Sequence, residues 1–571
     1  MKPTDALFES IYPRDGLLVI GLVAQVGTNL DDLCAALQNR LQDKKYEVEV
    51  LSLSRFLSAG GTKTQEKQAK GTRLRKGLSC QHALALCAIA EIASKFNGND
   101  DRSRKAFIIR SLKRPEEIEA LRMVYGEAFL AIGVHTPKSK RLFYLRDVKG
   151  DKNGEDTIGA DENAADYFGQ RIRDTFEFCD FFIKGIDPEY VGLTRALKLC
   201  FGSVFTTPSR DEYAMAMAYA ASLRSADLSR QVGAAIMNDS REIVAVGANE
   251  VPRFGGGQAW EDDRPDLRDF AELKYDPNVV ERDELINNFL TGLDGVESEQ
   301  GTLPMKDDPE VRKILKRSGL LDITEFGRTV HAEMACLMSS LRNHIDVRGS
   351  TLYSTTYPCH NCVRHIIASG VTTVKYVEPY PKSRAEKLFR TSCSFWDDDY
   401  NEQTGEPMEV RQGLRLEPFI GIGPRKYHDL FAMKTLSGKR IERKDEASGK
   451  ALDESTMGLQ DLKWPTSHFG LADREKRAVE QLVSLWDSGL EAEFPEVAKL
   501  IPEGATTITE WQQHLDVDPE ATGRKPTSAE KTSGTQPKQR TPKGRKEQRA
   551  DRTILNVEEG AEDARKASEG A

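Results

Sequence analysis

The feature that most constrains the fold is an alternation of short apolar segments with helical patterns between residues 17 and 187. Five segments are typical of strands: LLVIGLVA, YEVEVLSL, AFIIRSL, AFLAIGV and FCDFFIKG. The helical patterns between them include LDDLCAALQNRLQ, SCQHALALCAIAEIASKF and RPEEIEALRMVYG. Buried strands that alternate with helices form a parallel sheet covered on both faces. We therefore predict a doubly wound α/β domain over residues 10–200.

The first predicted strand runs into a glycine-containing loop, GLVAQVGTNL, which precedes a helical pattern. Ligands of doubly wound sheets bind beyond the carboxyl ends of the strands. Gly21, Gly27, Thr28 and Asn29 could therefore cradle an anion through backbone amides at the start of the helix. Thr28 stands where phosphate-binding loops carry lysine. We expect the loop to sense a nucleotide, or to be a relic of the fold, rather than to transfer phosphoryl groups.

A second α/β unit is predicted over residues 201–435. Its segments are a helix in PSRDEYAMAMAYAASLRSAD, a hairpin of VGAAIMN and EIVAVGANEVP, and the strands STLYSTTY and TTVKYVEPY. A polar insertion interrupts the unit at about residues 254–327, and it could be either a lid or a surface decoration. Residues 436–520 form a C-terminal extension that includes a helical pattern, REKRAVEQLVSLWDSG.

Composition limits the partners of the chain. The formal net charge is −9, yet nine Lys or Arg and two Glu lie between Arg524 and Arg549, so the rest of the chain carries −16. An acidic body argues against nucleic acid as the main partner, because such binding rests on a basic face. The tail over residues 521–571 is basic, of low complexity and poor in apolar residues, so we predict disorder there.

Nothing in the sequence predicts a membrane protein. No apolar run approaches the roughly 20 residues that span a bilayer, and the N-terminus MKPTDALFES lacks the apolar core of a signal peptide. Nine cysteines are scattered over the chain, which fits a reducing compartment better than a disulfide framework. We expect a cytoplasmic protein.

Two motifs carry the sharpest chemistry: HAE in TVHAEMACL, and PCHNC in YPCHNCVRHII. They supply one imidazole and two thiolates, from His331, Cys359 and Cys362. Zinc favours this ligand set, and three protein ligands leave a fourth position open for water. H-x-E together with P-C-x-x-C is the zinc deaminase signature, in which the glutamate acts as general acid and base. We therefore predict a Zn²⁺ site with Glu333 as the catalytic residue, the alternative being a structural zinc knuckle.

The stretch RSADLSRQVGAAIMNDSREIVAVGANEVP, followed by these two motifs, resembles the deoxycytidylate deaminase branch of the cytidine deaminase fold. The resemblance implies a mixed five-stranded sheet between helices, with zinc held at the N-termini of two helices. It implies the same three ligands and the same proton shuttle. It further implies that Asn249, in GANEVP, contacts the deoxyribose and that the backbone of Ala332 contacts the edge of the base.

With the N-terminal domain included, the chain is similar to bacterial anti-phage dCTP deaminases over about residues 10–435. SLKRPEEIEALRMVYGEAFLAIGV, FGQRIRDTFEFCDFFI, EPYPKS and EPFIGIGPRKYHDLF carry this resemblance. It implies a P-loop kinase-like domain, degenerate here, ahead of a deaminase that converts dCTP, with dCMP as a weaker or parallel substrate, and so starves phage replication. Lys382, Ser383, Arg425 and Lys426 could hold the triphosphate by charge-assisted hydrogen bonds, unless they belong to ordinary charged loops.

Two other functions share the zinc site. A deaminase of tRNA or single-stranded DNA would need a basic groove lined with aromatic residues. A nucleotide-sensing toxin or scaffold would keep zinc and act mainly through partners. We expect a deoxycytidine nucleotide as substrate, a regulatory nucleotide at the N-terminal domain, and a homo-oligomer.

Overall fold

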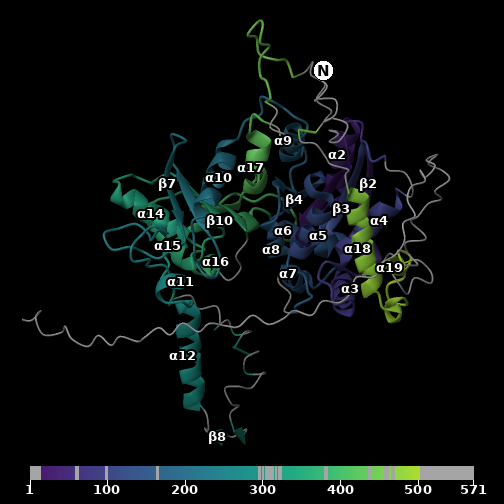
Figure 1. Ribbon diagram of the computed structural model, residues 1–571. Helices are drawn as coiled ribbons and strands as arrows, with labels where there is room; N and C mark the ends of the chain where they lie inside the picture. Colours follow the sequence, from purple (N-terminus) through teal and green to yellow (C-terminus); the bar gives the residue numbers. More distant parts are fainter. Residues whose placement is uncertain are drawn as a thin grey trace, which may run out of the picture. The chain divides into compact units, whose positions relative to one another are not determined.

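The structure is a computed structural model, shown in Figure 1. It describes residues 15–57, 63–96, 101–162, 166–293, 325–378, 383–434, 440–454, 462–463 and 470–501, with a few short stretches between 297 and 320. The predicted tail at 521–571 and Lys382 lie outside the described residues. Contacts group Met1–Val517 into one compact unit, to which all elements below belong. Within the described part of the chain, no helix combines the length and hydropathy that a membrane crossing requires.

The first sheet has the strand order β14-β5-β4-β1-β3-β2. Strands β1 to β5 are parallel, as the sequence predicted, and β14 joins the edge antiparallel to β5. The strands are β1 (Leu18–Ala24), β2 (Glu47–Ser52), β3 (Lys105–Leu112), β4 (Phe129–His135), β5 (Phe181–Lys184) and β14 (Gly421–Ile422). Because β14 runs antiparallel to β5, the sheet is mixed rather than wholly parallel.

Strand β1 explains why its sequence is apolar throughout. All seven of its residues are buried. Val19 and Val23 face one apolar cluster, whereas Leu18, Ile20 and Leu22 face the other, as the alternation of side chains along a strand requires. Helices α4, α5 and α18 cover the first face, and α2 and α9 cover the second. The doubly wound arrangement of this sheet is therefore confirmed.

The helices around the first sheet follow its strands in chain order. Their bounds are α2 (Asp31–Gln42), α3 (Thr64–Gly77), α4 (Ala83–Ser94), α5 (Pro115–Tyr125), α6 (Lys138–Phe143), α7 (Gly154–Glu162), α8 (Ile172–Phe176) and α9 (Val191–Cys200). Short helical turns add η1 (Leu53–Leu57), η2 (Gly126–Ala128) and η3 (Tyr144–Val148).

The second sheet has the order β12-β13-β11-β10-β6-β7. Strands β10 to β13 are parallel, and the predicted hairpin of β6 and β7 adds antiparallel beside β10. The strands are β6 (Gly233–Met237), β7 (Ile243–Ala248), β10 (Thr351–Thr356), β11 (Thr373–Glu378), β12 (Cys393–Phe395) and β13 (Leu414–Pro418). The sheet thus has six described strands where the resemblance implied five.

Helices cover both faces of the second sheet. Helices α14 and α15 pack on one face, and α10 packs on the other. The bounds are α10 (Arg210–Ser222), α14 (Ala332–Arg342), α15 (His360–Ser369), α16 (Ala385–Leu388), α17 (Pro424–Phe431) and the turn η5 (Trp396–Asp398). The insertion contributes α11 (Asp269–Glu272), α12 (Pro277–Leu293), β8 (Glu297–Ser298) and β9 (Gly301–Thr302).

The two sheets share one apolar core. Met215 and Ala218 of α10 lie in the same buried cluster as β1 and α4. The carboxylate of Glu212 caps α10 through the amide of Ser209, pairs with Arg195 of α9, and accepts a hydrogen bond from the amide of Ile422 in β14. A buried carboxylate is stable only with such partners, so this residue fixes α10, α9 and β14 together.

The C-terminal extension packs on the first sheet. The predicted helix is present as α18 (Leu471–Leu485), which lies beside α4 in Figure 1 and is followed by η6 (Ser488–Leu490) and α19 (Pro495–Ala498). Buried Glu475 of α18 pairs with buried Arg102 at 2.7 Å. The predicted domain limits at residues 200 and 435 stay a prediction, because β14 and α18 both cross over to the first sheet.

Candidate active site

His331, Cys359 and Cys362 form a compact group whose ligand atoms all lie within 4.8 Å of one another. The Nδ1 atom of His331 is 3.4 Å from the sulfur of each cysteine. Two thiols and an imidazole are the donors that zinc prefers, and the group contains three ligands among the described residues. The residues present therefore fit a Zn²⁺ ion with an open fourth position.

The sequence places these ligands at the starts of two helices that lie side by side (Figure 1). His331 has extended dihedral angles and precedes α14, and Cys359 precedes α15 with its sulfur accepting from the amide of Cys362. Gly247 of β7 permits the close approach of α14 to the sheet, because a Cβ there would lie 2.6 Å from the carbonyl oxygen of Ala332. Helix starts favour negative charge and hence thiolate ligands.

The same local geometry explains the HAE spacing. Residues two apart on a helix point about 200° apart, which would separate His331 from Glu333. His331 lies just before the helix, whereas Glu333 lies in its first turn, so both side chains reach the same place. The carboxylate of Glu333 is buried, and its Oε2 is 3.6 Å from the sulfur of Cys362.

The ionisable groups of the site perturb one another strongly. A hydrogen bond from Cys362, with the neighbouring His331, lowers the pKa of Cys359 to about 4. The same hydrogen bond raises the pKa of Cys362, and the hydrogen bond to Cys359 raises the pKa of His331 to about 9. Burial raises the pKa of Glu333, and the Cys359 thiolate raises it further. The group is therefore arranged around a thiolate that attracts a cation.

A cavity of about 200 Å³ opens beside this group. Its wall includes Glu333 and Tyr357, and also residues that precede β6, the insertion, and the chain just after it. The insertion contributes part of this wall, so this part of it lies at the cavity. Its residues there are Asp269, Asp276, Pro277 and Asn278. Besides His331, Arg230 is the one basic side chain among the described residues of the wall.

Asn249 and Ala332 both line the cavity. The side chain of Asn249 accepts from the amide of Val232 at 2.7 Å and donates to the carbonyl of Arg230 at 2.8 Å. It therefore braces the segment that carries Arg230, and its contact with deoxyribose stays a prediction. Ala332 is the first residue of α14, where backbone amides have no carbonyl partner within the helix.

Of the predicted phosphate ligands, Ser383, Arg425 and Lys426 lie in the described part of the chain, and none of these three lines the cavity. The hydroxyl of Ser383 donates to the carbonyl of Pro358, directly before Cys359. Arg425 packs its guanidinium on Phe178, and Lys426 donates to Glu127 at 2.6 Å. Neither basic residue of this pair lines the cavity, so their role as phosphate ligands stays a prediction. The sequence analysis missed Arg230, whose signal was its place just before the strand VGAAIMN.

The predicted nucleotide loop has the expected strand, turn and helix. Gly21 lies inside β1, paired with Ile109 and Ala131, and so belongs to the sheet rather than to the loop. Gly27 has φ +87°, and a Cβ there would lie 2.7 Å from the carbonyl oxygen of Arg141. Asn29 accepts from the amide of Asp31 at the start of α2, and the hydroxyl of Thr28 is buried without a hydrogen-bond partner in the described structure. These contacts show no P-loop.

Residues 208–378 match the family described as cytidine and deoxycytidylate deaminase zinc-binding region. Mouse deoxycytidylate deaminase is 27% identical over 184 residues, which cover 31% of this chain and 73% of the mouse protein. The human enzyme of the same name is 26% identical over 183 residues, covering 31% and 72%. A crystal structure of dCMP deaminase from cyanophage S-TIM5 with dCMP and dUMP has 17% identity and a TM-score of 0.20, covering 37% of this chain and 98% of that one.

The metal group predicts a specific loss of zinc. Replacing Cys362→Ser removes a thiolate ligand, so the zinc content of the purified protein should fall from one ion per chain to near zero. Inductively coupled plasma mass spectrometry measures this. Cys393→Ser is the matched control, because Cys393 is also buried in the second sheet but lies outside the group, and it should retain zinc. Full zinc content in Cys362→Ser would contradict the assignment.

Proposed function

We propose that this chain hydrolyses deoxycytidine nucleotides, on the premise that residues 208–378 form a domain of the cytidine and deoxycytidylate deaminase family. The observation that carries the proposal is the joining of His331, Cys359 and Cys362 with the buried carboxylate of Glu333 at the wall of one cavity. A structural zinc knuckle needs neither an open coordination position nor a cavity beside it. The substrate we propose is dCTP, with dCMP as a second substrate.

The chemistry needs a nucleophile and a proton carrier. Zinc held by His331, Cys359 and Cys362 would supply the Lewis acidity that makes water a nucleophile near neutral pH. The water oxygen bonds to C4 while Glu333 moves one water proton to the ring nitrogen; Glu333 then takes the proton of the resulting C4 hydroxyl and delivers it to the leaving amine. The bond between C4 and the exocyclic nitrogen breaks, ammonia leaves, and uracil forms. Burial raises the pKa of Glu333, which suits a group that must both accept and release a proton.

Arg230 is our candidate for contact with the substrate phosphate. Arg230 lines the cavity, its side chain is 41% exposed, and its guanidinium pairs with the carboxylate of Glu378. Burial raises the pKa of Glu378 to about 7, so that carboxyl gives up its charge more readily than an ordinary glutamate. A phosphate can therefore compete for Arg230 at a modest electrostatic cost.

The charges of the cavity favour a nucleotide over a polynucleotide. Asp227, Asp269 and Asp276 line it together with Arg230. A strand of nucleic acid brings one negative charge per residue and needs a basic groove with stacked aromatic side chains. One arginine among three aspartates suits a compact ligand whose phosphates meet a single cation. We therefore propose a free nucleotide, rather than tRNA or single-stranded DNA, as the substrate.

The proposed role is depletion of dCTP during phage infection. It is supported by the resemblance of residues 10–435 to anti-phage dCTP deaminases and by the two joined α/β parts of the fold. Loss of dCTP withholds a precursor from phage DNA synthesis. A regulatory nucleotide at the first sheet and assembly into a homo-oligomer belong to the same proposal.

Removing the proton carrier should separate metal binding from turnover. Glu333→Gln should retain zinc and lose about 10²- to 10⁴-fold in deamination rate, because the amide cannot move protons. Chromatography of uracil products from dCTP, dCMP and a cytidine-containing RNA measures the activity. Glu119→Gln, at an exposed position of α5, is the matched control and should be fully active. Activity confined to RNA would overturn the proposed substrate.

Removing the candidate phosphate contact should weaken substrate binding. Arg230→Ala should raise KM for dCTP by about tenfold or more, since a hydrogen bond between charged groups is worth about 1.5–3 kcal/mol, while kcat changes little. Steady-state kinetics of the two constants measures this. Arg411→Ala removes an exposed arginine away from the zinc cavity and should leave both constants unchanged. An unchanged KM in Arg230→Ala would reject this contact.

The cellular role predicts that protection depends on catalysis. Bacteria that express the chain should resist a DNA phage, and those that express Glu333→Gln should be as sensitive as cells without it. Plating efficiency and the dCTP pool after infection are the measurements. Protection retained by the Glu333→Gln variant would favour a scaffold or toxin that works through partners.

A further inference from the structure

The loop after β1 lies where doubly wound sheets bind ligands. It runs over residues 25–30, from the carboxyl end of β1 to the start of α2, and the amide of Thr28 closes a turn on the carbonyl of Gln25. The neighbouring strands β3 and β4 are parallel to β1 and end at the same edge. Ligands of such sheets bind at this edge, next to the strand where the order reverses.

A carboxylate of the chain already occupies the anion position of this loop. Asp161 of α7 is fully buried, and its Oδ2 accepts from the amide of Val26 at 2.7 Å. Its Oδ1 lies 2.7 Å from the Nζ of Lys113, which also donates to the carbonyl of Ala24. A loop amide and a lysine ammonium are the two donors that a phosphate oxygen takes at such a loop. The lysine missing from the loop sequence is thus supplied by the end of β3.

Unsatisfied hydroxyls lie in the loop and in the chain that follows β4, toward the same edge of the sheet. Thr28, Thr136 and Ser139 each have a buried hydroxyl without a hydrogen-bond partner in the described structure. Thr136 and Ser139 are only 5% and 2% exposed. Thr28 and Thr136 both lie against Gly185, at the carboxyl ends of β4 and β5. A buried polar group without a partner costs about 1–3 kcal/mol, so these hydroxyls point to a ligand that completes them.

The neighbouring guanidinium joins these hydroxyls to the loop. Buried Arg141 donates to the carbonyl of Thr136 at 3.2 Å and reaches the carbonyl of Val26 at 3.5 Å. It also lies 3.4 Å from the carboxylate of Glu162, the residue after Asp161. The loop, Thr136 and the end of α7 are therefore parts of one polar cluster.

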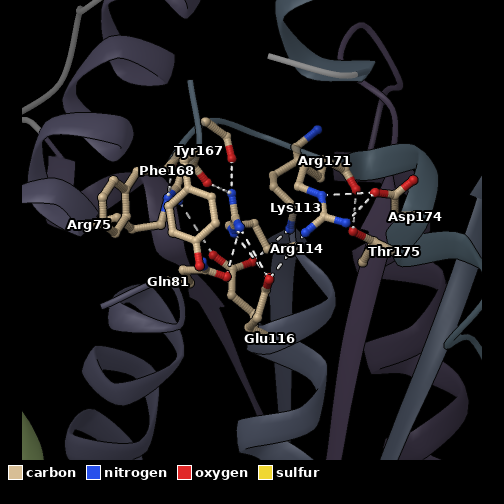
Figure 2. Close-up of polar contacts among 12 residues, drawn as sticks. Arg75, Gln81, Lys113, Arg114, Glu116, Tyr167, Phe168, Arg171, Asp174 and Thr175 are labelled. Atoms are coloured by element: carbon tan, nitrogen blue, oxygen red, sulfur yellow. Dashed lines mark hydrogen bonds and ion pairs between the residues drawn. The ribbon is translucent and has the colours of Figure 1, made fainter. Parts of the chain in front are cut away.

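Helix α7 has little apolar packing and is held mainly by polar contacts, among them hydrogen bonds from Gln65 to the hydroxyl of Thr157 and from Gln68 to its carbonyl. Ile158 packs with Leu142 and Leu145 in a small cluster that is separate from the main cores. The described chain after α7 has several polar contacts, and Figure 2 shows that Arg114 donates to the carbonyl of Tyr167 and Arg75 to that of Phe168. Arg114 also donates to the carbonyl of Gly169. Segments with few buried apolar contacts open at low free energy.

We propose that the loop of residues 25–30 and Lys113 form a phosphate site that Asp161 keeps closed, and that a phosphate-bearing ligand opens it by displacing α7. Both anions compete for the amide of Val26 and the ammonium of Lys113, so only one can be bound. The ligand class is a nucleotide or an inorganic polyphosphate. This site is separate from the zinc cavity and does not depend on its chemistry.

Release of α7 has a route to the second sheet. Lys138 pairs with Glu155 of α7 at 3.0 Å, and its amide donates to the carboxylate of Asp397 in η5 at 2.7 Å. Lys140 donates to the carbonyl of Gly405, close to η5 along the chain. Asp397 is half-buried and belongs to η5, which contacts β13 of the second sheet. Displacement of Asp161 therefore loosens a segment that contacts the catalytic half of the chain.

The first test measures binding of inorganic pyrophosphate to the full chain by calorimetry. Asp161→Asn keeps the shape of the side chain and removes its charge, so pyrophosphate should bind at least about tenfold more tightly than to the unmodified chain. Lys113→Met should weaken binding by a similar factor. Asp156→Asn makes the same change at an exposed position of α7 and should have no effect. Equal affinity of the Asp161→Asn variant and the unmodified chain would overturn the proposal.

The second test needs no variant and so covers the case in which Asp161→Asn fails to fold. Saturating pyrophosphate should speed amide hydrogen exchange in residues 154–162 and slow it in residues 25–30. Slower or unchanged exchange in residues 154–162 would reject displacement. Repeating the titration with ATP distinguishes the sources: a tighter response to ATP identifies a nucleotide, and an equal response identifies the polyphosphate alone. Neither readout requires deamination, so failure of the proposed substrate would not affect this result.

Discussion

The structure of the catalytic half depends on burying one thiolate beside two further acidic groups. Cys359, Cys362 and Glu333 meet within a few ångströms of one another, and the cation within this group is His331. Such a group is unfavourable unless a metal ion or helix-start amides balance it. The fold supplies helix-start amides, because α14 and α15 begin at the ligands and the amide of Cys362 points at the sulfur of Cys359, and the three ligands fit a Zn²⁺ ion. The parallel pairing of β10 with β11 then explains why the two helix starts meet, since helices that follow or precede neighbouring parallel strands share an edge.

A second buried carboxylate determines how the two sheets are joined. Glu212 binds Arg195 and the amides of Ser209 and Ile422, so one side chain of α10, the helix that covers the second sheet, is tied to α9 and β14 of the first. The shared apolar cluster and the pairing of β14 with β5 make this junction continuous. The first sheet is therefore part of the structural support of the catalytic half, and a ligand that changes one sheet acts on a common core.

Much of this could be predicted from the sequence, because periodicity and ligand spacing are local properties. The apolar run of β1 and the spacing of HAE and PCHNC predicted the first sheet and the metal group without any knowledge of contacts. The functions of charged residues could not be predicted in the same way. Arg230 and Lys426 look alike in the sequence, yet one faces the zinc cavity and the other pairs with Glu127. Gly21 belonged to an apparent loop motif but lies within a strand. Burial of Asp161 depends on a lysine 48 positions earlier in the chain, a distance that no local pattern records.

At both anion positions of this chain, a backbone amide donates a hydrogen bond to the anion. At the zinc site the amide of Cys362 holds a thiolate, and at the loop the amide of Val26 holds the carboxylate of Asp161. The first anion is fixed, because Cys359 lies at the start of a helix packed into the core of its sheet. The second is carried on α7, which has a small apolar contact of its own. An anion on a firmly packed element makes a permanent ligand, whereas an anion on a loosely packed element makes a competitor that another anion can replace. We attribute the fixed thiolate at the zinc site and the replaceable carboxylate at the loop to this difference in packing, rather than to a difference in hydrogen bonding.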